Sequence, residues 1–274
     1  MLAVVHIHKT AGTTLSGVLK HANGGTHCDV LAEDPEAPFF SAEDLKRLRR
    51  WYPRLRSILG HDVRAYSDLE TVVPAVDWVA FLREPLNRTA SHYQYDVQRG
   101  GLDVPFEEWI THDVVRDRQT RIVAGPGGTA EEAIDLLGGF AFVGLTERFD
   151  ESLVMLGRKV GIGDLRYASR WVAPSDGIKK RLLTDPATRE MLVAANREDL
   201  TLYEHLVHEV YPKQQAEYGI GLDTDVAWFR RHNQGVTRWR MYATPRYATY
   251  VAKWRGGYYP WVERRRGRAA AVPS

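Results

Sequence analysis

The pattern of apolar and polar positions at the start of the chain predicts a strand, a turn and a helix. Residues 2–7 form a short apolar run rich in β-branched side chains, as in a buried strand. Apolar residues then recur at helical spacing through residues 13–20. A turn that contains Gly12 separates the two runs, so the chain is expected to pass from strand to helix there.

The same alternation continues along most of the chain. Ser41, followed by Asp44 three residues later, is close to a capping box and begins a predicted helix that ends near Tyr52. Pro85 interrupts another apolar run and opens a helix that Gly100 ends. The predicted strands are 2–7, 57–60, 78–82 and 140–145, and the predicted helices are 13–20, 41–52, 86–99, 105–112, 114–124, 129–137, 147–161, 178–183, 187–196 and 199–210.

Strands that alternate with helices of this length predict an α/β fold, in which a parallel sheet is covered by helices on both faces. After Asp164 only helices are predicted, so the later part of the chain is expected to be helical. The composition changes at Leu222, and we therefore predict a main domain of residues 1–221 and an extension of residues 222–274.

Composition limits the kind of protein. The 274 residues are 44% apolar, which is enough for one sizeable core. The single cysteine, Cys28, excludes an internal disulfide and a cysteine-rich zinc site, and it fits a reducing compartment. No apolar run approaches the ~18 residues that span a bilayer, and the first predicted strand begins at Leu2, so we expect a cytoplasmic protein without a signal peptide.

The turn after the first strand contains residues that suit an anion. Where a strand passes through a glycine turn into a helix, backbone N–H groups and the positive end of the helix dipole surround one point. Lys9 adds a positive charge, and the hydroxyls of Thr13 and Thr14 can donate hydrogen bonds to phosphate oxygens. The alternative is an ordinary turn whose threonine only caps the helix.

The order of these residues differs from the nucleotide-triphosphate P-loop, in which the lysine follows the glycines. Here Lys9 precedes Gly12, and the strand that often carries a magnesium-binding aspartate ends at Arg83. This order predicts an anion that protein cations neutralise, without a metal. Ser91 lies eight residues after Arg83, and both should lie at the same sheet edge as Lys9. A ligand with phosphate groups at both ends would bridge the two motifs.

Several segments together resemble the sulfotransferases that use 3′-phosphoadenosine 5′-phosphosulfate (PAPS), in particular the heparan sulfate 6-O-sulfotransferase-like branch of carbohydrate sulfotransferases. VHIHKTAGTTL, residues 5–15, resembles the loop that binds the 5′-phosphosulfate. FLREPLNRTASHY, residues 81–93, resembles the motif that binds the 3′-phosphate. Weaker similarities in DVQRGG, RDRQTRIVAG, FVGLTERFDESL and NREDLTLYEHL extend the resemblance over about residues 3–210. It implies a three-layer, P-loop-like parallel sheet.

The resemblance implies a set of donor-binding residues, which are Lys9, Thr10, Ala11, Gly12, Thr13, Thr14, Arg83 and Ser91. Lys9 is also expected to act in catalysis, because its ammonium can stabilise the negative charge that develops on the leaving oxygen. The family's loop around the adenine and 3′-phosphate should fall near residues 167–175. No metal ligand is expected.

His61 is the candidate for the catalytic base. It follows the predicted strand 57–60 and should lie at the same sheet edge as the anion-binding turn. With an ordinary pKa of about 6.5, a histidine is mostly neutral at pH 7 and can accept a proton. In the resembling branch a histidine that follows a strand at this position serves as the base. His8, within the turn, and His92, beside Ser91, are the alternatives.

The predicted function is a PAPS-dependent sulfotransferase that transfers a sulfuryl group to a hydroxyl of a carbohydrate or a glycosylated small molecule. The alternatives are an ATP- and magnesium-dependent small-molecule kinase of P-loop type and a non-catalytic anion-binding module. Candidate residues for binding the acceptor are Tyr95 and, for a sulfated or carboxylated acceptor, Arg99, Arg118, Gln119 and Arg121.

Residues 222–274 hold 11 Lys and Arg against 3 Asp and Glu, and they include four of the eight tryptophans. In one interpretation the aromatic residues dock on the main domain while the arginines face water. In the other, the segment is an adhesive surface for an anionic glycan, lipid or partner chain, with peripheral contact to a membrane. Nucleic acid is not expected as a partner, because no fold signal supports it.

Overall fold

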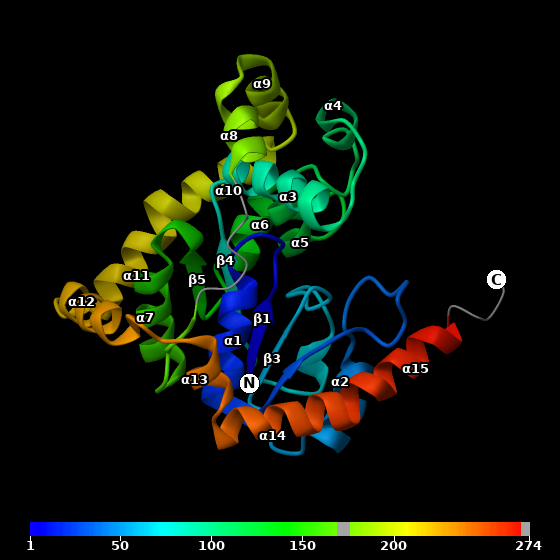
Figure 1. Ribbon diagram of the computed structural model, residues 1–274, viewed down its shortest axis with the longest axis vertical. Helices are drawn as coiled ribbons and strands as arrows, with labels where there is room; N and C mark the ends of the chain where they lie inside the picture. The colour runs from blue at the N-terminus through cyan, green and yellow to red at the C-terminus, as the bar shows by residue number, and fades with distance from the viewer. Residues whose placement is uncertain (169–175, 270–274) are drawn as a thin grey trace.

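The computed structural model describes residues 1–168 and 176–269, in which five parallel strands form one sheet (Figure 1). The strands are β1 (Leu2–Val5), β2 (His27–Asp29), β3 (Ser57–Gly60), β4 (Asp77–Leu82) and β5 (Phe142–Leu145), in the order β2-β3-β1-β4-β5. All four predicted strands are present, although the first ends at Val5. β2 was not predicted, because three residues are too few to show an apolar period.

Helices pack against both faces of this sheet, which confirms the predicted three-layer α/β class. Residues on β1, β3 and β5 are buried throughout, as expected where both faces of a strand are covered. The helices are α1 (Gly12–Asn23), α2 (Ala42–Trp51), α3 (Pro85–Arg99), α4 (Phe106–Trp109), α5 (Arg118–Ala124), α6 (Ala130–Leu137), α7 (Phe149–Val160), α8 (Gly177–Thr184), α9 (Pro186–Ala194), α10 (Arg197–His205), α11 (Tyr211–Tyr218), α12 (Leu222–Asn233), α13 (Arg238–Tyr242), α14 (Pro245–Lys253) and α15 (Tyr259–Ala269).

One helix begins later than the sequence pattern suggests. The predicted helix 114–124 is reduced to α5, because Asp117 has a left-handed backbone with φ 44°. The Asp117 carboxylate accepts hydrogen bonds from the amides of Glu198 (2.9 Å) and Asp199 (3.3 Å). This contact with α10 is made between distant parts of the chain, so the local pattern could not indicate it.

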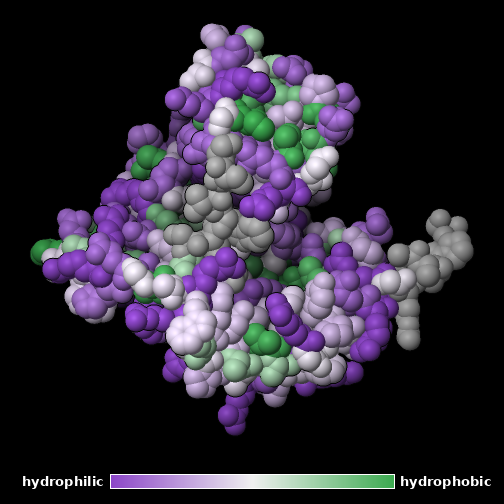
Figure 2. All heavy atoms as spheres, viewed as in Figure 1, coloured by the Kyte–Doolittle hydropathy of each residue, from purple (hydrophilic) through white to green (hydrophobic). Residues whose placement is uncertain are grey.

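A smaller lobe stands beside the carboxyl ends of the strands. α3, α4, α8 and α9 share an apolar cluster of their own, which includes Tyr93, Trp109, Leu182 and Leu192 (Figure 1). Figure 2 shows a mostly polar surface on the facing side, with apolar atoms reaching the surface in small areas, one of them on this lobe. The lobe thus forms one wall beside the edge of the sheet at which the predicted site residues lie.

The extension packs on the main domain through its aromatic residues. α14 and α15 continue into one another through a π turn at Trp254–Tyr258 and cross the edge of the sheet at β2 (Figure 1). The indole Nε1 of Trp254 donates to the Asp29 carbonyl oxygen (2.8 Å), and the Tyr258 hydroxyl donates to the Leu31 carbonyl oxygen (3.0 Å). The boundary near residue 221 stays a prediction.

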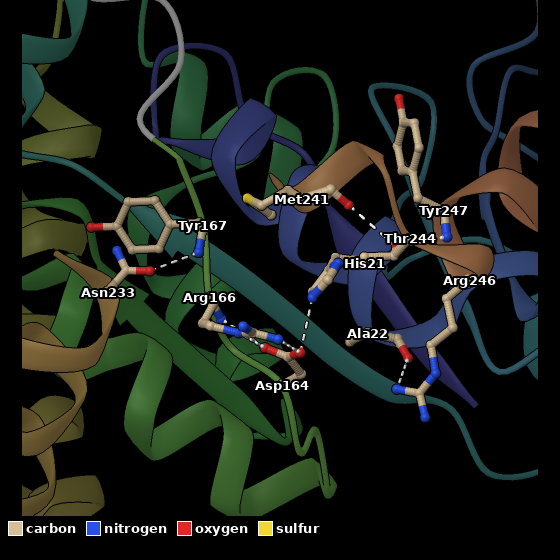
Figure 3. Close-up of polar contacts among 10 residues, drawn as sticks. All are labelled: His21, Ala22, Asp164, Arg166, Tyr167, Asn233, Met241, Thr244, Arg246 and Tyr247. Atoms are coloured by element: carbon tan, nitrogen blue, oxygen red, sulfur yellow. Dashed lines mark hydrogen bonds and ion pairs between the residues drawn. The ribbon is translucent and has the colours of Figure 1, made fainter. Parts of the chain in front are cut away.

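Polar contacts also tie the C-terminal end of α1 to later parts of the chain (Figure 3). His21 Nε2 lies 2.9 Å from the Asp164 carboxylate, which also accepts a 2.7 Å hydrogen bond from Arg166. Arg246, on α14, donates to the Ala22 carbonyl oxygen (3.4 Å). None of the helices in residues 1–168 and 176–269 combines the length and apolar character required to cross a membrane.

Candidate active site

The carboxyl ends of β1, β3 and β4 meet at a cavity of about 660 Å³. Because the three strands are parallel neighbours, the residues that follow them lie at one edge of the sheet. Predicted site residues that line the cavity are Lys9, Ala11, Gly12, Thr13, Thr14, His61, Arg83 and Ser91. The side chain of Thr10 does not, since it is buried and donates to the Ile7 carbonyl oxygen at 3.0 Å. Only the backbone N–H of Thr10 could therefore contact a ligand.

The turn after β1 has an unusual backbone. Lys9 and Ala11 have φ angles of 68° and 62°, in the left-handed region that residues other than glycine rarely adopt. Such conformations cost roughly 1 kcal/mol or more each and persist where the surroundings enforce them, often at functional sites. Here the internal hydrogen bond of Thr10 helps to hold the turn. Turns of this kind point successive N–H groups toward one anion-binding concavity.

The first turn of α1 presents donors that lack protein acceptors. The amides of Gly12 and Thr13 donate to no backbone carbonyl in the part of the chain that the structure describes. The Thr14 amide, by contrast, donates to the Ala11 carbonyl oxygen (2.9 Å), so only its hydroxyl is available to a ligand. The first turn of α1 has no acidic residue to offset the positive end of the helix dipole. This helix end is suited to an anion.

Gly12 is required for close packing at the same point. A Cβ atom at this position would lie 1.9 Å from the ring of His6, whereas real Cβ contacts are much longer. Any larger residue would push the His6 ring away or displace the start of α1. The glycine therefore sets the distance between the anion-binding turn and the histidines beside it.

Lys9 extends into the cavity, where its Nζ lies 4.3 Å from the centre of the Tyr95 ring. Burial and then the charge of Arg83 lower the pKa of Lys9, while Asp96 raises it. No ion pair of Lys9 is found among the described residues. Tyr95, which was predicted as an acceptor contact, lines the same cavity beside Lys9, and its role stays a prediction.

Arg83 joins the end of β4 to the turn after β1. Its Nη1 donates to the Lys9 carbonyl oxygen (3.1 Å), and its Nε lies 3.9 Å from the Glu147 carboxylate. Gln119 holds the backbone of Arg83 on both sides, accepting from its N–H (2.9 Å) and donating to its carbonyl oxygen (2.8 Å). Ser91 lines the same cavity from α3. The two predicted phosphate motifs are thus in direct contact.

His61 lies between two other imidazole rings. Its ring centre is 3.9 Å from that of His6 and 3.8 Å from that of His8, with planes inclined by 20° and 12°. This sandwich restricts rotation of the His61 ring. Burial lowers the pKa of His61, whereas its hydrogen bond to the His6 carbonyl and the charge of Asp62 raise it. The net direction is downward, so the imidazole is neutral at pH 7.

The hydrogen bond of His61 determines which nitrogen can accept a proton. Nδ1 lies 2.9 Å from the His6 carbonyl oxygen, which can only accept, so Nδ1 must carry the hydrogen. In the neutral ring Nε2 then has a free lone pair. The His6 backbone, just after β1, therefore holds His61 in the tautomer that leaves Nε2 free to accept a proton.

The alternative bases are less suitable. Burial, followed by the charge of His61, lowers the pKa of His8 to about 2. Burial, followed by the charge of Arg88, lowers the pKa of His92 to about 3. Both remain neutral but are very weak bases. His61 differs from both in the Nδ1 hydrogen bond to the His6 carbonyl, which fixes its tautomer, whereas His92 Nε2 lies 3.6 Å from the Asp96 carboxylate.

The other residues that were predicted to bind the acceptor do not all lie in this cavity. Arg99 lines the cavity, whereas Arg118 and Arg121 line a separate one, and Gln119 is buried against Arg83. Of the predicted loop 167–175, residues 169–175 lie outside the described residues.

Sequence reasoning missed His6, whose ring and carbonyl both contact His61, and it missed Asp176 and Lys179 at the start of α8. His6 is the one polar residue within the first apolar run, residues 2–7, and this was a usable signal. Nothing local indicated that α8 folds back to the cavity.

No family model matches the sequence, and no curated protein is similar to it. Among solved structures, the chain is similar to the crystal structure of a sulfotransferase from Alicyclobacillus acidocaldarius, with 17% identity, a TM-score of 0.47, and coverage of 76% of this chain and 95% of that chain.

The described residues contain no group of three or more His, Cys, Asp and Glu side chains placed to hold a metal ion.

Proposed function

We propose that the protein is a sulfotransferase that transfers a sulfuryl group from PAPS to a hydroxyl of a carbohydrate or glycosylated small molecule, without a metal. The observation that carries the proposal is the meeting, in one cavity, of an anion-binding turn, the Arg83 and Ser91 pair, and His61 with a free Nε2. Each of these motifs, taken alone, could be explained by a role in the fold without any ligand. Their convergence favours a ligand with two anionic ends beside a general base.

The residues present fit the donor. PAPS supplies the sulfuryl group and carries phosphates on both sides of its ribose. The amides of Gly12 and Thr13 and the hydroxyls of Thr13 and Thr14 would hold its 5′ end. The Arg83 guanidinium and the Ser91 hydroxyl would hold its 3′-phosphate.

Two side chains would act on the reacting groups. Lys9 supplies a cation without an ion-pair partner in the described residues, and it would stabilise the negative charge that develops on the leaving oxygen. His61 would accept the proton of the acceptor hydroxyl at Nε2 while Nδ1–H stays bonded to the His6 carbonyl. The resulting positive charge on His61 would be stabilised by Asp62.

The binding test uses thermal stability and needs no acceptor. The purified protein is melted with 3′-phosphoadenosine 5′-phosphate (PAP), with adenosine 5′-phosphate and with ATP plus magnesium, each with and without EDTA. A ligand at a hundred times its dissociation constant stabilises the folded state by about 2.7 kcal/mol, which gives a measurable rise in Tm. We expect a rise with PAP that EDTA does not change. A magnesium-dependent rise with ATP and none with PAP would instead establish a kinase-type site.

A further inference from the structure

A positively charged surface lies where the end of α2 meets the long helix formed by α14, the π turn and α15. Its exposed members from α2 and the turn after it are Arg50, Trp51 and Arg54, and those from the long helix are Lys253, Arg255 and Tyr259. We call these six residues the basic face. None of them lines the candidate active-site cavity, so the function proposed above does not use them.

Ring contacts join the two segments of the basic face. The ring centre of Trp51 lies 6.4 Å from that of Trp261, and a Cβ atom at Gly257 would lie only 2.9 Å from the Trp51 ring. Lys253 Nζ lies 5.3 Å from the centre of the Tyr52 ring. Figure 1 shows α2 beside the long helix that contains α14 and α15. Residues that are about 200 positions apart in the sequence therefore form one surface.

Acidic residues are missing from the two stretches of sequence that build this face. Residues 45–61 contain six Lys and Arg and no Asp or Glu, and residues 226–262 contain seven Lys and Arg and again no Asp or Glu. The exposed Glu263 follows directly after the second stretch. Within residues 1–168 and 176–269, no ion pair is found for any cation of the basic face. The face therefore presents positive charge to its surroundings.

Neighbouring cations, by contrast, do have acidic partners. Arg47, one turn earlier on α2, lies 3.2 Å from Glu43 and 3.0 Å from Glu33. Arg265, on α15, lies 3.8 Å from the same Glu33. These carboxylates are thus paired with cations outside the basic face. The cations of the face itself are solvated and available to an external anionic surface.

Two aromatic side chains stand among these cations. Trp51 is 41% exposed and Tyr259 is 37% exposed, and the Tyr259 ring stacks on that of Trp254 with ring centres 4.5 Å apart. Side chains that combine an apolar ring with one polar group are favoured at the interface between membrane and water. Arginine and lysine beside them can lay their apolar stems on the same boundary while the charge stays with the lipid headgroups. A polyanion without apolar groups would leave the exposed rings unused.

The shape of the surface also favours a membrane. Proteins that bind single-stranded nucleic acid hold its backbone in a basic groove. The basic face instead includes exposed side chains of a helix that lies along the outside of the molecule (Figure 1). A basic helix that lies flat and exposes aromatic residues is typical of contact with anionic lipids.

We infer that the basic face binds the surface of a membrane that contains anionic lipids. Its arginines and Lys253 contact the lipid phosphates, and the rings of Trp51 and Tyr259 enter the boundary between headgroups and acyl chains. This inference goes beyond the proposed function and does not depend on it. A protein without sulfotransferase activity would bind the membrane in the same way.

The test is co-sedimentation of the full chain with vesicles of phosphatidylcholine alone, and with vesicles of equal parts of phosphatidylcholine and phosphatidylglycerol. We expect binding to the anionic vesicles only, and weaker binding as salt is added. Each cation near an anionic membrane contributes roughly fivefold to binding, so Arg50→Gln combined with Arg255→Gln should weaken it by about 25-fold. Neither side chain forms a hydrogen bond or ion pair within the described residues, so Tm should stay unchanged.

The matched control is Arg181→Gln combined with Arg189→Gln, which removes the same charge from exposed positions on α8 and α9 and should bind like the wild type. Absence of binding to the anionic vesicles would overturn the inference. Equal binding by the two double variants would overturn it as well, because only the total charge would then matter.

A further variant separates a membrane from other polyanions. Tyr259→Ser should weaken binding to the anionic vesicles by about fivefold, because an apolar ring no longer enters the lipid. Its binding to dextran sulfate, a polyanion without apolar groups, should equal that of the wild type. Trp51→Gln serves as a second variant if Tyr259→Ser does not fold. Vesicle binding that the loss of the ring leaves unchanged would assign the face to polyanions in general and overturn the membrane assignment.

Discussion

Helix α1 carries polar and charged groups at both ends, and the two ends differ in how far protein partners pair these groups. At the N-terminal end, the amides of Gly12 and Thr13 have no backbone acceptor and the ammonium of Lys9 has no ion-pair partner in the described residues. At the C-terminal end the charge of Lys20 and the Nε2 atom of His21 are paired, while the buried His21 Nδ1 has no partner among the described residues. Lys20 forms an ion pair with Asp29, and His21 contacts Asp164, as Figure 3 shows for the latter.

We interpret this difference as a binding role for the N-terminal end of α1 and a structural role for its C-terminal end. Burial alone would raise the pKa of Asp29, but the charge of Lys20 and the hydrogen bond from His27 outweigh it and lower that pKa. The C-terminal end thus joins α1 to β2 through groups that satisfy one another. The N-terminal end leaves strong donors beside a strained turn, where an anionic ligand can accept from them.

The largest expected effect comes from removing the base. His61→Ala should lower turnover by about 10²- to 10⁴-fold, the usual contribution of general acid–base catalysis, while PAP affinity stays near the wild-type value. Steady-state kinetics and PAP titration of the same preparation measure both quantities. His112→Ala, which removes an exposed histidine away from the cavity, is the control. A wild-type rate in His61→Ala would mean that another group accepts the proton.

The two lysines at either end of α1 allow a matched comparison. Lys9→Ala should lower turnover by about 10²- to 10³-fold, as when one transition-state donor is removed, with little change in Tm. Lys20→Ala should leave PAP affinity intact but reduce the free energy of unfolding by about 2 kcal/mol, less than for a fully buried pair because Asp29 keeps partial exposure. Equal effects on stability from both variants would remove the distinction between the two ends.

A smaller effect is expected from replacing Arg83, and it should show which phosphate of the donor this residue contacts. Arg83→Ala is expected to weaken PAP binding by about 10- to 100-fold, because a charged hydrogen bond to the 3′-phosphate is lost. Binding of adenosine 5′-phosphate, which lacks that phosphate, should hardly change. Titration calorimetry with both nucleotides gives the comparison. Equal losses for the two would show that Arg83 contacts some other part of the ligand.

Lowering the pH should reduce the free energy of unfolding through the histidines that precede the N-terminal end of α1. Burial lowers the pKa of His6 and His8 to about 3 and about 2, so both stay neutral in the folded protein as the pH falls below about 6.5. The unfolded chain takes up these protons, which reduces the free energy of unfolding by up to about 1.4 kcal/mol per pH unit for each histidine. Denaturant unfolding at pH 7, 6 and 5 should therefore show a shallower pH dependence in His8→Asn than in wild type. An unchanged slope in His8→Asn would contradict the burial of a neutral His8.

Local patterns in the sequence predicted much of the fold and the centre of the site. The strand-turn-helix at residues 2–20 and the residues after β3 and β4 were indicated by short apolar runs, and parallel pairing then brings Lys9, His61 and Arg83 to one edge. What could not be predicted depends on contacts between distant segments. Asp176 and Lys179, which reach the cavity from the start of α8, are an example. The strand β2, by contrast, was missed because three residues are too few to show an apolar period.

The most direct test of the account is amide hydrogen exchange with and without PAP, since it reports on both ends of α1 in one experiment. We predict slower exchange in residues 9–14 and 83–91 when PAP is bound, and unchanged exchange in residues 20–29. Slower exchange only in residues 20–29, or equally at both ends, would contradict the claim that the N-terminal end of α1 is the donor site.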